Sequence, residues 1–459
     1  MRLLTSQEDL SKTYTENLDH IDIRSPSMST HKRPGVNTIA TDQGHKRNIF
    51  GLLGFKQPDN ALARNNAVAV FLMGALPAVA GSAISFMLGI FLAWGLISLA
   101  LGRFEFRLTR LDRQLAWAFT AYAALVFATG LFAENGGWVF RSTLWLLPFL
   151  ASWAVIPRLR ATPGIDYLQL YILGAGVGCI GALAFAGFQI SPFELERPEG
   201  GAGNAAVFAT LTLCLAGIAG LGIDAPRRSH RLLAGFALVA GLAAVVLSLT
   251  RGVIMVIPLT LILLLAYSPR AWRAVLLRPA TLALLAGAGL LLAYSAWGML
   301  ESRLHFTLEE VEKLLSGAHS DSMGERVRLW GAAWSAFKDS PLWGYGVQNR
   351  MDALVPYLMR DNLPNLGFTH PHNAYLTALL DGGLIVLAAL LVLLATPIVV
   401  AWRAPRDAAW RQRLFLALVV TGTYAATGMT QIMFKHDIMD AFFIFTAIVI
   451  AASAPPKGR

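Results

Sequence analysis

From Asn65 onward the chain consists mainly of apolar runs close to the roughly 20 residues that a helix needs to cross about 30 Å of hydrocarbon. Backbone groups in lipid must be hydrogen-bonded within their own segment, and these runs are too long and too uniformly apolar for barrel strands. Composition agrees, since 55% of the residues are hydrophobic and 14% are charged, whereas soluble domains carry about 25% charged residues. The sequence therefore predicts an all-α, polytopic integral membrane protein.

The apolar runs number about twelve, and one long polar loop interrupts them. The expected spans are 65–81, 83–101, 115–132, 138–156, 167–188, 204–223, 231–249, 252–268, 279–297, 374–401, 413–431 and 438–453. The chain then divides into a tail (1–64), helices 1–9 (65–297), the long loop (298–373), and helices 10–12 with the C-terminus (374–459).

The tail, residues 1–64, is polar and shows no apolar periodicity. Such a segment cannot bury enough apolar surface to offset its ordering entropy, so we expect it to be disordered. It contains no apolar core of the kind that a cleavable signal peptide requires.

The distribution of basic residues predicts which side of the membrane each loop faces. The net charge is +10, which cytoplasmic loops rich in Lys and Arg explain without a nucleic acid partner. Alternate loops are basic, and they are 102–113, 157–160, 227–231, 270–278, 403–413 and 457–459. Both termini are therefore expected in the cytoplasm and the loop 298–373 on the outer side.

The outer loop carries patterns of ordered structure. Residues 306–315 alternate apolar and charged side chains at helical spacing. Ser322 and Glu325 form a capping box, and a helix is expected from there until Pro341. The glycines of Trp343-Gly344-Tyr345-Gly346 indicate a tight turn.

Several arginines fall at the outer mouth of the expected bundle, where positive charge is scarce. They are Arg141, Arg197, Arg251, Arg326 and Arg328. A single arginine at a membrane edge is commonly a snorkelling anchor, and Arg141 and Arg328 fit that interpretation best. A group of guanidinium ions can instead bind phosphate oxygens in pairs, which makes Arg197 and Arg251 candidates for a diphosphate site.

Two histidines precede the expected tenth span. His372 is the candidate for proton transfer, because an imidazole can accept a proton from a sugar hydroxyl near neutral pH; the alternative is a histidine that orients the turn. His370 is expected to support that turn. Asn373 fits a helix N-cap or an amide that orients a hydroxyl. Asp381, inside an apolar run, needs a partner, either an arginine or His436.

Metal and thiol chemistry have no support in the sequence. It contains no DxD, no HExxH and no Cys/His cluster. Cys179 and Cys214 lie inside apolar runs and indicate neither a disulfide framework nor a nucleophile. No ATP-binding motif is present, so no cofactor is expected.

These residues resemble the O-antigen ligase and O-antigen polymerase superfamily of bacterial inner-membrane enzymes. The resemblance covers roughly 195–400 and rests on Arg326-Val327-Arg328-Leu329-Trp330, Gly344-Tyr345-Gly346, His372-Asn373 with Gly383, Arg197 with Asn204, and Ser248-Leu249-Thr250-Arg251-Gly252. Val386, where a small residue is common, and Gly203 with Ala202, in place of a proline-containing turn, depart from the ligase pattern.

The resemblance implies a GT-C-like, metal-independent, inverting transferase with a periplasmic active site. It would move a glycan from undecaprenyl diphosphate to the lipid A core, in contact with membrane lipids. His372 would activate the acceptor hydroxyl, and Arg197, Arg251 and Arg326 would hold the diphosphate. Asn373, His370, Asp381 and Arg141 would support the site.

Three alternatives remain open. The O-antigen polymerase and the protein O-oligosaccharyltransferase share the chemistry and differ in acceptor, and the short C-terminus speaks against the protein-modifying type. A polytopic transporter belongs to a different class. Transporters place ionisable residues near the midplane and often contain inverted repeats, whereas here the charges gather at the outer mouth and no repeat is found.

Overall fold

The computed structural model describes residues 58–131, 144–191, 197–269, 322–360 and 368–456, with a few single residues between them. Within these ranges the secondary structure is helical, without strands. Six of the described helices are long and apolar enough to cross a membrane, and Arg251–Tyr267 is a shorter apolar stretch. The protein is thus an all-helical, multi-pass membrane protein, and the expected number of about twelve spans stays a prediction.

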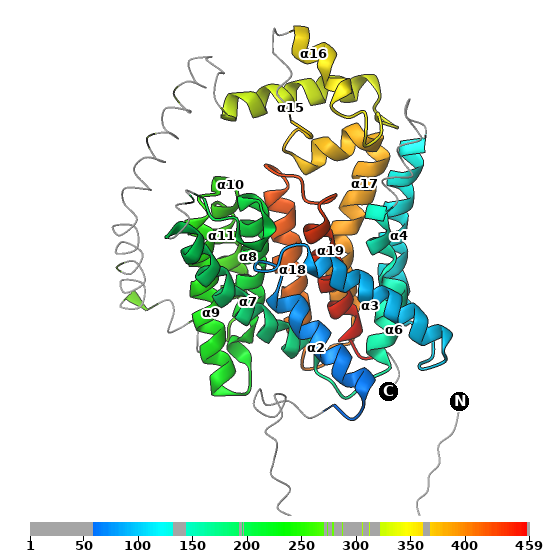
Figure 1. Ribbon diagram of the computed structural model, residues 1–459, viewed down its shortest axis with the longest axis vertical. Coiled ribbons are helices and arrows are strands. Elements are labelled where there is room, and N and C mark those ends of the chain that lie inside the picture. The colour runs from blue at the N-terminus through cyan, green and yellow to red at the C-terminus, as the bar shows by residue number, and fades with distance from the viewer. Residues whose placement is uncertain are drawn as a thin grey trace, which may run out of the picture. The chain divides into compact units, whose positions relative to one another are not determined.

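The chain separates into two units, Met1–Phe55 and Lys56–Arg459, and the described residues belong to the second (Figure 1). Its α-helices are α2 (Ala61–Ala75), α3 (Ala83–Ala100), α4 (Arg110–Leu131), α6 (Ser152–Arg160), α7 (Tyr167–Ile190), α8 (Ala205–Gly220), α9 (Arg228–Leu247), α10 (Arg251–Ile254), α11 (Ile257–Tyr267), α15 (Ser322–Asp339), α16 (Val355–Arg360), α17 (Ala374–Arg403), α18 (Trp410–Thr427) and α19 (Asp437–Ala452). The expected span 279–297 and the expected helix 306–315 lie almost wholly outside the described residues.

Close packing in the bundle depends on small residues. A Cβ atom on Gly174 of α7 would lie 2.2 Å from the carbonyl oxygen of Phe71 in α2, and one on Gly74 would lie 2.6 Å from that of Tyr171. In lipid, where no hydrophobic force drives helices together, such backbone contact provides the van der Waals energy of association. α19 is apolar on all sides and nearly every residue in it is buried, so it forms the centre of the bundle.

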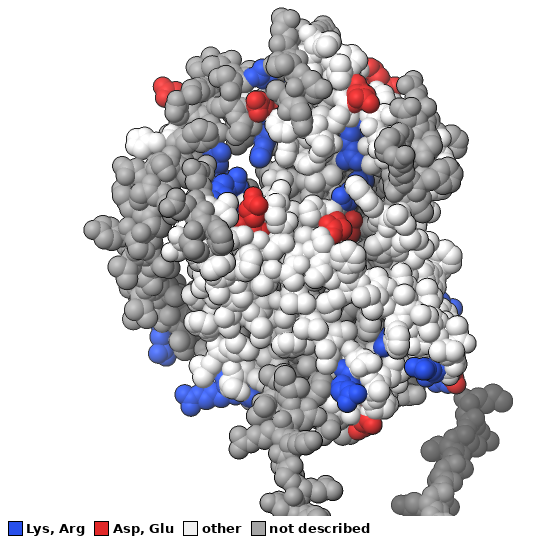
Figure 2. All heavy atoms as spheres, viewed as in Figure 1, with Lys and Arg blue, Asp and Glu red and all other residues white. Residues whose placement is uncertain are grey.

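Charged side chains gather toward the ends of the second unit. In Figure 2, basic and acidic residues cluster on this face between α15 and the helical body, the middle of the face is almost free of charge, and further basic residues lie at the opposite end. A charge-free belt between two charged ends is the pattern expected of a protein that spans a bilayer.

One expected cytoplasmic loop is wrong in detail. Residues 157–160 form the last turn of α6 rather than a loop. Arg158 is 1% exposed, and its Nε donates to Asn66 Oδ1 at 2.8 Å. Arg160 forms an ion pair with Asp112 at 2.7 Å. Local composition showed two arginines beside a polar break, but it could not show that distant helices supply their partners.

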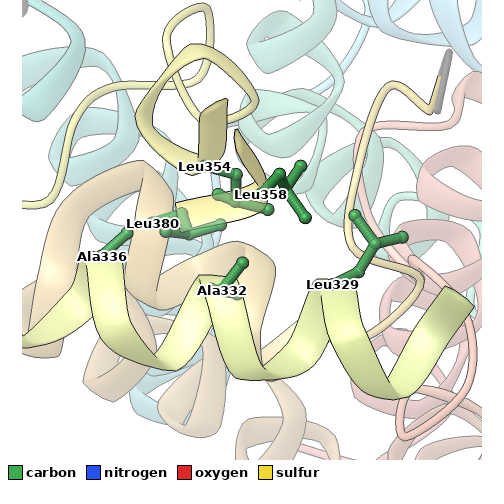
Figure 3. Packing of buried hydrophobic residues seen from close by; sticks show 7 residues of the cluster. Leu329, Ala332, Ala336, Leu354, Leu358 and Leu380 are labelled. Atoms are coloured by element: carbon green, nitrogen blue, oxygen red, sulfur yellow. The ribbon is translucent and has the colours of Figure 1, made fainter. Parts of the chain in front are cut away.

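Residues 322–360, which we call the outer segment, have a small hydrophobic core (Figure 3). α15 directs Leu329, Ala332 and Ala336 toward Leu354, Leu358 and Leu380. Leu380 belongs to the first part of α17, so this part is covered by the outer segment rather than by lipid. The helix expected after Ser322 is present and ends at Asp339. Pro341 follows shortly after, and it lacks the backbone N–H that a continued helix would need.

α17 is not one continuous span, as residues 374–401 were expected to be. Gly382 (φ −162°, ψ 27°) and Gly383 (φ 61°, ψ −153°) are not helical. The stretch after the break, 384–403, is still long enough to cross about 30 Å of hydrocarbon. The residues before it, 374–381, form a short separate helical segment at the outer end.

The turn at 341–346 fills the break in α17. Tyr345 N–H donates to Leu380 O at 2.6 Å, Gly346 N–H donates to Asp381 O at 3.1 Å, and Leu384 N–H donates to Pro341 O at 2.8 Å. Backbone groups that the break releases are therefore hydrogen-bonded again, as a nonpolar environment requires.

Candidate active site

Residues 370–373 form the histidine corner. Its last residue, Asn373, is the N-cap of the first segment of α17. Its Oδ1 accepts hydrogen bonds from the backbone of Tyr375 and Leu376, both at 3.0 Å, as an N-cap side chain does. Its Nδ2 donates to Met429 O at 3.1 Å. The amide of Asn373 is thus used for capping and for contact with the chain that follows α18.

The two histidines lie against each other. His372 has φ 51°, and its backbone N–H donates to His370 Nδ1 at 3.1 Å. The ring centroids of His370 and His372 are 4.3 Å apart, and Phe368 meets His372 edge to face at 5.1 Å. A non-glycine residue in the left-handed region is strained, and such strain persists where the surroundings hold it.

The outer helix α15 reaches the same corner. Trp330 Nε1 donates to Pro371 O at 2.8 Å, which ties the peptide between the two histidines to α15. Arg326, one turn earlier, acts on both imidazoles through its charge.

The environment keeps both imidazoles neutral. Burial and the positive charge of Arg326 lower the pKa of His372, and a side-chain hydrogen bond with Gln431 raises it in part. Burial, His372, Arg350 and Arg326 lower the pKa of His370 to about 3. An imidazole with a pKa below its ordinary value of about 6.5 is unprotonated near pH 7, which is the form that accepts a proton.

The shift predicts a pH profile. If His372 is the base, transfer should stay constant as the pH falls to about 6.5 and decline only below it. Replacing Arg326 with glutamine removes a positive charge that disfavours the imidazolium, so the acidic limb should move to higher pH. The profile of kcat/KM for the wild type and Arg326→Gln measures this, and an acidic limb that does not move in the variant would contradict the electrostatic role of Arg326.

A second corner lies between α9 and α10. Arg197 donates from Nε to Ser248 O at 3.3 Å and from Nη2 to Thr250 Oγ1 at 3.2 Å. Leu249, within this corner, has φ 51°, and Arg251 begins α10. The structure thus brings Arg197 to the backbone corner that presents Arg251.

Residues 428–436, which follow α18, join the two corners, and we call them the bridging loop. Gly428 O accepts from Ala374 N–H at 2.8 Å, and Met429 O accepts from Nδ2 of Asn373, the residue after His372, at 3.1 Å. On its other side, Thr430 packs against Gly252, where a Cβ atom would lie 2.4 Å from Thr430 Oγ1. His372 and the Arg197–Arg251 corner therefore lie around one loop.

Asp381 is enclosed between two cations. It is fully buried and pairs with Arg350 at 3.0 Å and with Lys435 of the bridging loop. An arginine partner was expected, but Arg350 and Lys435 were not singled out from the sequence, and His436 pairs instead with Asp437 at 3.5 Å. Both cations fall on the side that the basic loops predict to be the outer one, where a charge calls for an explanation, and that was the only signal available.

The remaining candidates are placed as follows. Arg141 lies outside the described residues. Arg328 lies on α15, and its Nε is buried without a hydrogen-bond partner among the described residues. Cys179 and Cys214 are buried and free. Within the described ranges, no group of three or more His, Cys, Asp or Glu side chains is arranged to hold a metal ion.

The described residues define a helical membrane protein in which two histidines with lowered pKa values lie near Arg326. Residues 234–391 match the family model described as O-antigen ligase, so this part of the chain is similar to the O-antigen ligase and O-antigen polymerase superfamily. The match supports glycosyl transfer of the O-antigen ligase kind. A search of curated proteins finds no match.

Proposed function

We propose that the protein is an O-antigen ligase that transfers O-antigen polysaccharide from undecaprenyl diphosphate to the lipid A core at the periplasmic face of the inner membrane. The observation that carries this proposal is the bridging loop. It contacts Asn373 and Ala374, the two residues after His372, on one side and the corner of Arg197 and Arg251 on the other. The reaction needs a proton acceptor and a site for the diphosphate anion, and the candidates for both lie beside one loop.

The reaction is a single displacement. The acceptor hydroxyl oxygen attacks the anomeric carbon, its proton passes to the imidazole of His372, and the bond to the diphosphate oxygen breaks with its electron pair. One displacement at that carbon inverts its configuration. Arg197, Arg251 and Arg326 would stabilise the negative charge on the departing diphosphate, the role in which guanidinium ions exceed ammonium ions.

Asn373 and His370 would hold the backbone of the histidine corner in place. Asn373 caps the helical segment that begins behind His372, and His370 accepts a hydrogen bond from the backbone of His372. Together they would hold the strained backbone that presents the imidazole. Arg141 remains a proposed support of the site from the sequence alone.

Reconstituted protein tests the proposal with a purified lipid-linked glycan donor. We expect glycan to appear on lipid A core when that acceptor is supplied, and the lipid carrier diphosphate to be released in equal amount. Donor without acceptor should remain unchanged.

The same experiment separates the alternatives. Lengthening of the glycan on the lipid carrier without lipid A core would establish a polymerase. Transfer to serine or threonine of an added protein, with none to lipid A core, would establish a protein O-oligosaccharyltransferase. Movement of intact donor across the vesicle membrane without bond formation would establish a transporter.

A further inference from the structure

We propose that Asp381 is a positioning residue that holds the bridging loop, and through it the imidazole of His372, in the orientation for proton transfer. The inference rests on the role of His372 in the proposed function. Asp381 acts without contact to a substrate, because its side chain is fully buried between Arg350 and Lys435.

The helical segment 374–381 is attached to the bridging loop at both of its ends. At the start, Asn373 Nδ2 donates to Met429 O at 3.1 Å, and Ala374 N–H donates to Gly428 O at 2.8 Å. At the end, Asp381 pairs with Lys435. The bridging loop therefore spans the length of this segment, and Asp381 fixes the end farther from His372.

Lys435 is held from two directions. Its ammonium pairs with Asp381, and its backbone N–H donates to both carboxylate oxygens of Asp440 at 3.1 and 3.2 Å. The backbone of Lys435 is in the left-handed region, with φ 75°, which a flexible loop would not adopt on its own. The ion pair thus helps to fix the loop that carries Gln431 and Thr430.

Asp381 also fixes residues 347–350, the outer turn, which follow the turn 341–346. Arg350 donates from Nε to Val347 O at 2.9 Å and pairs with Asp381 at 3.0 Å. Its charge is one of the influences on His370. One carboxylate therefore joins three parts of the corner, which are the outer turn, the segment behind His372 and the bridging loop.

Loss of this carboxylate has a defined consequence. Arg350 and Lys435 would remain buried beside each other without their common counter-ion, and like charges in a poorly solvated site repel strongly. The bridging loop is the segment that ends such repulsion most easily by moving, and its movement loosens the contacts of Gly428 and Met429 with the residues that follow His372. The effect should then fall mainly on the rate of transfer. Thr430 of the same loop packs against Gly252, so a smaller change in donor binding at the Arg197–Arg251 corner is expected.

Asp381→Asn tests the inference. We expect kcat to fall about 10²-fold, as for misplacement of a catalytic group by about 1 Å, while KM for the donor changes less than twofold. A readout that needs no substrate is the rate at which diethyl pyrocarbonate modifies His372, followed by peptide mass spectrometry across pH. Modification should become several-fold faster as the imidazole leaves its packed position.

Asp112→Asn is the matched control. Asp112 is also fully buried and paired with an arginine, but it lies at the start of α4 and pairs with α6 rather than with the outer corner. This variant should lose stability while its His372 modification and its transfer rate per folded molecule stay at wild-type values. Equal changes in both variants would show a general loss of packing and overturn the inference.

If Asp381→Asn does not fold, Lys435→Gln provides the same test. It removes the ion pair between Asp381 and the bridging loop, while the ion pair of Asp381 with Arg350 remains. It should reproduce the faster modification of His372. Wild-type modification in whichever of the two variants folds would overturn the positioning role. If the wild-type protein transfers glycan to no acceptor, the proposed function fails, whereas the modification experiment still decides how the corner is held.

Discussion

Replacing His372 with alanine is expected to lower kcat for glycan transfer by about 10²- to 10⁴-fold, the contribution of a general base. The imidazole is half-buried and its pKa is lowered by burial and Arg326, so the wild-type enzyme presents the proton-accepting form near pH 7. The measurement is transfer to lipid A core by reconstituted protein at saturating donor. Residual activity in the variant should lose the acidic limb of the pH profile.

Two histidine controls separate a base from a structural residue. His305→Ala, at an exposed position of the outer loop, should leave transfer unchanged. His370→Ala should cause a smaller loss than His372→Ala, because it removes the acceptor of the His372 backbone hydrogen bond but leaves the base. If His370→Ala proved the more damaging of the two, the assignment of the base would be wrong.

Arg251→Ala should differ in kind from His372→Ala. Removing a residue that binds diphosphate in both the ground state and the transition state raises KM for the donor. Donor analogues that retain the diphosphate should lose affinity for this variant but not for His372→Ala.

The second large effect is expected for Gly383→Ala at the break in α17. Gly383 has φ 61°, and a Cβ atom there would lie 2.3 Å from both the backbone C and the backbone O of Leu342. Alanine at positive φ costs more than about 1 kcal/mol before any clash, and here the obstacle is backbone that cannot rotate away. The turn 341–346 should be displaced, with loss of both stability and transfer.

Gly331→Ala is the matched control for this prediction. Gly331 is an exposed residue of α15, and a Cβ atom there would meet nothing within 4 Å. In a helix, this change is expected to stabilise by about 0.5–1 kcal/mol. Thermal unfolding of the two variants in detergent gives the comparison, and a Gly383→Ala protein as stable as the wild type would show that the turn is not needed to fill the break.

Much of the fold followed from local patterns. The long apolar runs predicted the helices α3, α7, α8 and α9 within a few residues of where the structure places them, because helix formation in lipid depends on the segment itself. The N-cap of α8 is Asn204, whose side chain accepts from two backbone N–H groups. Asparagine is among the residues preferred at that position.

Such local patterns did not predict the interruption of α17. The run from Ala374 is apolar apart from Asp381 and a few threonines and reads as one span, and its two glycines are tolerated in many membrane helices. What breaks the helix is the turn 341–346, which supplies hydrogen bonds to the groups set free. That turn lies in another part of the chain, so the break depends on tertiary contact.

The sequence by itself determined that the chain is a helical membrane protein and identified the histidine corner and the outer arginines, because hydrophobicity, helix capping and charge placement are properties of neighbouring residues. Only the tertiary structure decided that Arg350 and Lys435 enclose Asp381, and that the bridging loop joins His372 to the Arg197–Arg251 corner. A buried charge must find a partner, but any of several cations can satisfy it. The packing of helices far apart in the chain selects which one does.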